Sequence, residues 1–127
     1  MIMQETTYRG DLNAYGQPSG FGVFQSDNFD YRGEFLAGLP HGVGVLNASN
    51  GLCYKGFFRH GQPNGIGEMS TANDDIYSGA WDKGSYRGTL PQAQIDHVVD
   101  TSQRAAIVAE KHAGIIEEDD DDCGPSM

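Results

Sequence analysis

The stretch YRGEFLAGLPHGVGVL, residues 31–46, decides the fold, because it recurs in altered form before and after itself. Four tyrosines are spaced 23 residues apart, and a glycine follows each of them two positions later. The pairs are Tyr8 with Gly10, Tyr31 with Gly33, Tyr54 with Gly56 and Tyr77 with Gly79. A fixed period of this length is typical of repeat architectures, in which each unit buries its apolar face by stacking on its neighbours.

Each unit has the pattern of a β-hairpin. In the second unit, residues 31–35 alternate between two faces, Gly38 marks a turn, and residues 42–46 form a return strand. The fourth unit begins well and then decays, since Leu90 replaces the second glycine of the return strand and Pro91 follows. The pattern therefore predicts a mainly β fold, an elongated single-layer sheet of successive antiparallel hairpins over residues 8–90.

One face of this sheet is expected to pack aromatic rings against glycines. Glycine leaves room above the backbone because it has no Cβ, so each tyrosine is predicted to lie flat over a Gly-x-Gly of the adjacent strand. The residues committed to this packing are Tyr8, Gly10, Tyr31, Gly33, Phe35, Gly42, Gly44, Tyr54, Gly56, Phe58, Gly65, Gly67, Tyr77, Gly79 and Trp81.

The opposite face carries a partly apolar stripe edged by charges. Its candidate protein-binding residues are Arg9, Phe21, Val23, Arg32, Val43, Val45, Lys55 and Ile66. Such a stripe on a curved sheet is a reasonable groove for a partner protein. The alternative interpretation is that the β-branched residues only stabilise the sheet through cross-strand pairing.

The pattern changes after Pro91, where glycines vanish and apolar residues recur at helical spacing. We expect helix over residues 102–113 and a second helical stretch over 92–100, with an N-cap at Asp100 and a C-cap at Gly114. The helix is expected to cap the open end of the sheet. The chain thus divides into an N-terminal edge segment (1–7), the hairpin array (8–90), a helical cap (91–116) and an acidic disordered tail (117–127).

Charge and cysteine content restrict the class of partner. The formal net charge is −10, and six of the 18 acidic residues lie in 117–122, which leaves 12 against eight Lys and Arg in the body. An acidic body disfavours nucleic acid and anionic membranes, so protein partners are expected. Cys53 and Cys123 show no metal-ligand spacing and do not indicate a disulfide scaffold, and no apolar run of 18 residues occurs. A soluble, intracellular protein is expected.

No pattern in the chain predicts catalysis. The Gly-x-Gly pairs lack the remaining spacing of a dinucleotide-binding loop, and His41, His60, His97 and His112 occupy unlike positions, as turn or surface histidines do. The acidic run 117–122 lacks the glycine and distal glutamate of a calcium-binding loop. We therefore expect no enzyme, no cofactor and no metal site.

The combination Tyr-x-Gly-x-aromatic, turn glycine and Gly-x-Gly at a period of 23 resembles the MORN-repeat family, in about three and a half repeats over residues 8–90. The resemblance implies an elongated sheet of hairpins that acts as a scaffold in cilia, flagella, axonemes or the cytoskeleton, or as a groove that holds a partner helix such as a myosin tail. Some members carry a methyltransferase or lipid-kinase domain after the repeats, for which the 37 residues after Leu90 are too few.

Three functions follow as hypotheses. The first is a non-enzymatic scaffold that docks onto a larger protein assembly, foremost a ciliary or flagellar axoneme or the cytoskeleton. The second is an adaptor that binds an amphipathic helix in the groove. The third is a phosphoinositide-binding module using Arg9, Arg32, Lys55 and Arg59, which the net charge disfavours. Unpaired strands at the sheet ends could also pair two copies into a homodimer.

Overall fold

The computed structural model describes residues 6–114. The acidic tail and most of the N-terminal edge segment lie outside the described residues. The elements are β1 (Thr7–Leu12), β2 (Pro18–Gln25), β3 (Phe29–Leu36), β4 (Leu39–Ala48), β5 (Cys53–Arg59), β6 (Gln62–Ser70), β7 (Ile76–Asp82), β8 (Ser85–Gly88) and α1 (Gln92–His112).

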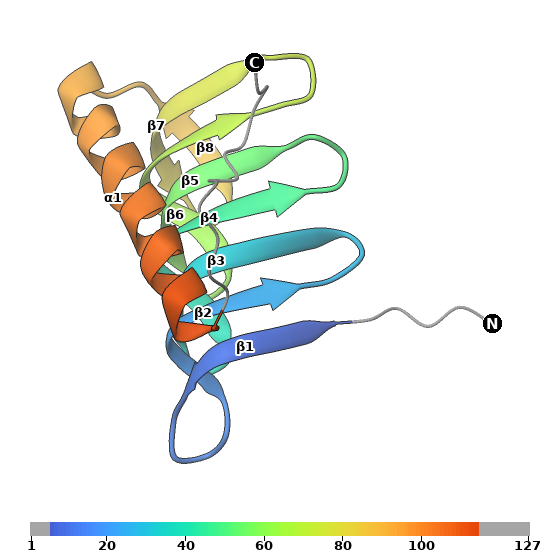
Figure 1. Ribbon diagram of the computed structural model, residues 1–127. Coiled ribbons are helices and arrows are strands. Elements are labelled where there is room, and N and C mark those ends of the chain that lie inside the picture. The colour runs from blue at the N-terminus through green and yellow to red at the C-terminus, as the bar shows by residue number, and fades with distance from the viewer. Residues whose placement is uncertain (1–5, 115–127) are drawn as a thin grey trace.

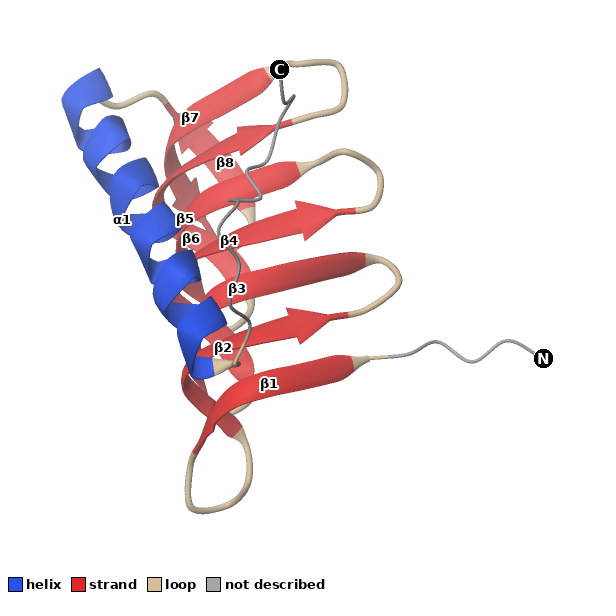
Figure 2. Cartoon of the chain, viewed as in Figure 1, coloured by secondary structure: helices blue, strands red, loops and turns tan. Residues whose placement is uncertain are grey.

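The eight strands form one open antiparallel sheet in the order of the sequence, β1 to β8, with α1 lying across it (Figures 1 and 2). The predicted mainly β fold of successive hairpins is confirmed. Most strands extend beyond the alternating core of their motif, because the residues that flank the turns also pair, whereas β8 ends at Gly88.

Glycine pairs with glycine across the two strands of each of the first three repeats. Gly33 lies opposite Gly44, and the register of β3 and β4 shifts just after this pair. The same pairing joins Gly10 to Gly22 and Gly56 to Gly67. A Cβ on Gly33 would lie 2.5 Å from the Cα of Gly44, so the two backbones approach too closely for a side chain.

Aromatic rings form a continuous column on what we call the tyrosine face. The ring of Tyr31 packs edge-to-face against Phe35 at 5.1 Å and against Phe58 at 4.9 Å, between ring centroids. Tyr31, Phe35, Tyr54, Phe58 and Trp81 are buried here. The column runs in the order Tyr8, Phe35, Tyr31, Phe58, Tyr54, Trp81 and Tyr86.

The sheet bends toward the tyrosine face. Tyr31 and Phe35 belong to one strand and would lie about 13 Å apart if that strand were straight. Their rings meet because β3 kinks at the register shift after Gly33. The Tyr31 hydroxyl donates a hydrogen bond of 2.9 Å to the carbonyl of Glu34 inside this kink. Tyr8 and Tyr54 make the equivalent bonds, to Asp11 and Phe57.

The fourth repeat departs from the pattern, as the decay of its sequence predicts. Tyr77 is 42% exposed and packs against Tyr86 instead of lying over a glycine pair. The Tyr86 hydroxyl donates to the carbonyl of Ser78 and its ring covers Trp81. The column therefore ends on a residue that the repeat pattern did not single out.

The helix differs from the expectation in length and in place. α1 is one uninterrupted helix, and Asp100 is not an N-cap, since its carboxylate pairs with Arg104 one turn later at 3.1 Å. α1 also does not close the end of the sheet. It runs back over β6, β5, β4, β3, β2 and β1 (Figure 1), and its contacts with Phe21 and Arg32 place it on the face opposite the tyrosines. Gly114, with φ of 83°, ends the helix as predicted.

Candidate functional site

The predicted groove lies beneath α1. We call this side of the sheet the valine face and define it by Arg9, Phe21, Val23, Arg32, Val43, Val45, Lys55 and Ile66. Val23, Val43 and Val45 are buried, with 1%, 6% and 5% of their surface exposed. The helix turns Ile95, Val98, Ser102, Ala105 and Ala109 inward, all of them buried. Small residues dominate the second half of this list and leave room for the helix to pack against the sheet.

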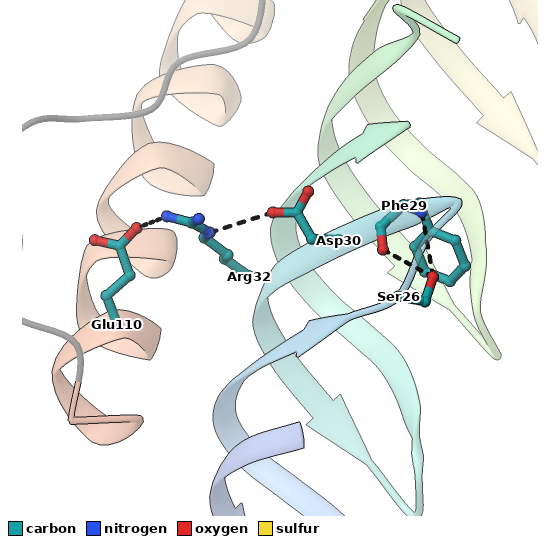
Figure 3. A network of polar contacts seen from close by, with 5 residues as sticks. All are labelled: Ser26, Phe29, Asp30, Arg32 and Glu110. Carbon is teal, nitrogen blue, oxygen red and sulfur yellow. Dashed lines mark hydrogen bonds and ion pairs between the residues drawn. The ribbon is translucent and has the colours of Figure 1, made fainter. Parts of the chain in front are cut away.

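A buried charge cluster fixes the C-terminal half of α1 to the sheet (Figure 3). Arg32 on β3 donates through Nη1 to the carboxylate of Glu110 on α1, and its Nε lies 3.5 Å from the carboxylate of Asp30. The side chains of Arg32 and Glu110 are only 13% and 11% exposed. Removing either partner would leave a charge in a poorly solvated place, so the cluster specifies one position of the helix.

The end of the helix is held by a second pair. The ring of His112 packs against Phe21, with ring centroids 5.4 Å apart, and its Nδ1 lies 2.8 Å from the carboxylate of Asp11 on β1. The same carboxylate accepts the backbone N–H of Phe21 at 2.9 Å. That backbone bond, and then the His112 contact, hold the pKa of Asp11 below its ordinary value.

The remaining basic residues of the valine face do not converge on one point. Arg9 is exposed, Lys55 is half-buried, and Arg32 is already engaged by Asp30 and Glu110. Arg59 lies elsewhere, in the hollow at the hairpin turns. The four basic residues named for phosphoinositide binding are therefore not gathered into one cluster.

A second concave surface lies along the edge where the hairpins turn. One hollow of about 500 Å³ is lined by residues that include His41, Phe57 and Arg59. An adjoining hollow of about 410 Å³ includes Arg59 again, with Gln62 and Lys83. His60 and Asn64 belong to both hollows. We call this continuous surface the turn cleft.

The valine-face residues were predicted from their alternation along the strands, but their covering by the helix was not. Glu110 and His112 were not singled out, because a glutamate and a histidine on a helix carry no pattern that names a partner on a distant strand. The turn cleft was missed for a related reason, since its residues come from three hairpins. Whether the valine-face residues bind a partner protein stays a prediction.

The described part of the chain offers no clustered donor set for metal chemistry. Within residues 6–114, no three His, Cys, Asp or Glu side chains gather closely enough to hold a metal ion. In the same range no helix is both long and apolar enough to cross a bilayer. Cys53 is buried and disulfide-bonded, contrary to the expectation from the cysteine spacing, and Cys123 lies outside the described residues.

The family assignment follows from the repeats. The sequence model of the MORN repeat matches residues 14–30, 31–53 and 54–76 in three consecutive segments. The chain is a MORN-repeat protein. The match begins inside the first hairpin and ends before the fourth, so the outer MORN units are the divergent ones. Comparison with curated proteins gives no match.

The family and the geometry agree on the kind of surface present. MORN repeats are non-enzymatic modules for interaction with proteins or membranes. In this chain the tyrosine face is filled by its own rings and the valine face by α1. The turn cleft is left as a concave surface that neither the aromatic column nor α1 fills.

Proposed function

We propose that this MORN-repeat protein is a non-enzymatic scaffold that docks onto a larger protein assembly, foremost a ciliary or flagellar axoneme or another cytoskeletal array. The proposal rests on the repeated sheet, in which the aromatic column connects each hairpin to the next. A stack of this kind presents turns at a fixed spacing along one edge, as a scaffold requires. Localisation in the cytoplasm and cytoskeleton, including a cilium or flagellum where the cell has one, belongs to the same proposal.

Detergent extraction of the source cells tests this function. The tagged full chain should remain with the cytoskeletal pellet, and proximity labelling from it should mark axonemal or cytoskeletal proteins above the level of the tag alone. A chain that is wholly released by detergent, with labelling no different from the free tag, would remove the scaffold from consideration.

A specific observation favours the adaptor as a second candidate. The valine face accepts an amphipathic helix in the structure, because α1 lies on it. A partner helix would then have to displace α1. Weakening the Arg32–Glu110 pair with Glu110→Gln should increase capture of such a helix, and a decrease or no change would count against the adaptor.

A further inference from the structure

The turn cleft carries two cations that the fold does not neutralise. Among the described residues, neither Arg59 nor Lys83 makes an ion pair, whereas Arg32, Arg87 and Arg104 all do. Both side chains are exposed, and both line the same hollow. The hollow therefore presents two positive charges to solvent in a chain of net charge −10.

The other polar groups of the turn cleft include side chains that can donate hydrogen bonds as well as accept them. The rings of His41 and His60 lie against each other at 6.2 Å between centroids, and Gln62 contributes an amide. One carboxylate lines the hollow, that of Asp82, and it is engaged by Arg87 at 3.5 Å. The lining therefore favours an anionic ligand.

The hairpin turns hold these donors at fixed positions. His60 and Lys83 have φ of 53° and 50°, and each is followed by a glycine that also has positive φ, the geometry of a tight hairpin turn. Each turn is tied to the hairpin before it. The carbonyl of Pro63 accepts the N–H of Gly84 at 2.9 Å, and the side chain of Asn64 accepts the N–H of Lys83 at 2.9 Å.

Repeat three also supplies an apolar wall where the earlier repeats place acids. Asp11 and Glu34 occupy this position in the first two repeats and accept backbone N–H groups. The third repeat has Phe57 there, packed over Gly65 and 39% exposed in the lining of the hollow. Phe57 can pack against the methylene groups of an acidic side chain.

The distance between equivalent hairpin turns indicates the shape of the ligand. Equivalent turns lie two strands apart, about 9.5 Å, and residues i and i+3 of an extended peptide are separated by about 10 Å. The donors of the turn cleft are spread along the row of turns. At a phosphate site on a helix N-terminus, by contrast, the donors converge on one point. We propose that the turn cleft binds an extended acidic segment of a partner protein, with carboxylates at i and i+3. This inference rests on the proposed scaffold function and names the chemistry of its partner.

The test uses the full chain and labelled peptides in a fluorescence anisotropy titration. One peptide carries three glutamates separated by two serines each, and a matched peptide carries the same residues with the glutamates adjacent. The spaced peptide should bind more tightly. The double variant Arg59→Glu with Lys83→Glu should weaken its binding by about tenfold or more, because two attractive contacts become repulsive.

The matched control changes the charge equally on α1, away from the turn cleft. Arg104→Glu with Lys111→Glu should leave binding within about twofold of wild type, since both side chains are exposed on the helix. Melting curves of all variants check that the sheet is intact. An equal loss in the control would overturn the site, because binding would then follow net charge alone.

Three further outcomes would also overturn the proposal. The first is inorganic phosphate competing as well as the spaced peptide, and the second is binding of the chain to anionic vesicles that depends on Arg59 and Lys83. In the third, replacement of the six acidic residues of 117–122 by Asn and Gln, which keeps Cys123, strengthens peptide binding about tenfold and so assigns the cleft to the chain's own acidic run. Failure of the wild-type chain to bind the spaced peptide, with its cytoskeletal retention intact, would reject the cleft and leave the scaffold function standing.

Discussion

At Gly44 the ring of Tyr31 fills the space that a side chain would need. A Cβ at this position would lie 2.2 Å from the Tyr31 hydroxyl oxygen and 2.5 Å from Cζ. Tyr31 cannot move aside, because it is fully buried between Phe35 and Phe58. The spacing of tyrosines and glycines predicted that each ring lies over a Gly-x-Gly. Tyr8, Tyr31 and Tyr54 lie over the second glycine alone, because a Cβ on the first glycine, Gly20, Gly42 or Gly65, would instead meet Asp11, Glu34 or Phe57.

Gly44→Ala should therefore lower the free energy of unfolding by about 1–3 kcal/mol through overpacking. Gly16→Ala is the control, since a Cβ at this position would meet open space. The only cost expected there is the backbone strain of a non-glycine residue at φ of 80°. This variant should cost less, about 1 kcal/mol. Urea unfolding of both variants measures the difference, and an unchanged Gly44→Ala midpoint would contradict the packing.

Burial of the tyrosine hydroxyls limits the stability of the fold at alkaline pH. Burial raises the pKa of Tyr8 to about 12, with a contribution from the nearby Asp11 charge. Burial also raises the pKa of Tyr31 and Tyr54. An unfolded tyrosine ionises near pH 10, so the stability held by the neutral hydroxyls is complete below about pH 10 and falls as pH rises toward the folded pKa.

The free energy of unfolding should accordingly decline between about pH 10 and 12. Tyr31→Phe should flatten this decline, whereas Tyr15→Phe should not, because Tyr15 is 88% exposed. Equilibrium urea titrations across this range give the comparison. Identical slopes for wild type and Tyr31→Phe would show that burial of this hydroxyl does not set the alkaline limit.

At the scale of the element, α1 shows what local pattern cannot determine. Helical spacing predicted a helix after Pro91, but the N-cap expected at Asp100 also predicted a break that does not occur. The hydroxyls of Thr101 and Ser102 donate to the carbonyls of His97 and Val98 within a continuous helix. Packing of α1 on the sheet favours one continuous helix over two, and a local sequence motif contains no information about that packing.

The Arg32–Glu110 pair should make the largest polar contribution to docking of α1. Glu110→Gln removes the charge from a nearly buried pair and should cost about 1–3 kcal/mol of unfolding free energy. Arg104→Gln breaks the exposed pair with Asp100 and should cost less than about 0.5 kcal/mol. Thermal melts of the two variants give the measurement, and equal shifts in Tm would show that burial of the cluster adds nothing.

At the scale of the whole molecule, the repeat pattern predicted the sheet far better than it predicted the site. Tyr31, Gly33 and Gly44 act within one repeat, so a fixed spacing records their contacts. The partner of Arg32 lies 78 residues away on another element, and no periodicity records that contact. The turn cleft likewise combines Arg59 with Lys83 from the next hairpin. A surface formed between elements can therefore be recognised only when the fold is known.

Whether α1 covers the valine face in solution decides which surfaces a partner can reach. Amide hydrogen exchange along α1 of the intact chain measures this most directly. We predict that the amides of Val98, Ser102, Ala105 and Ala109 are protected to a degree that approaches the central strands β3 and β4, because all four side chains are buried against the sheet. Exchange at the rate of an isolated, marginally stable helix, with the sheet still protected, would contradict the account and leave the valine face open.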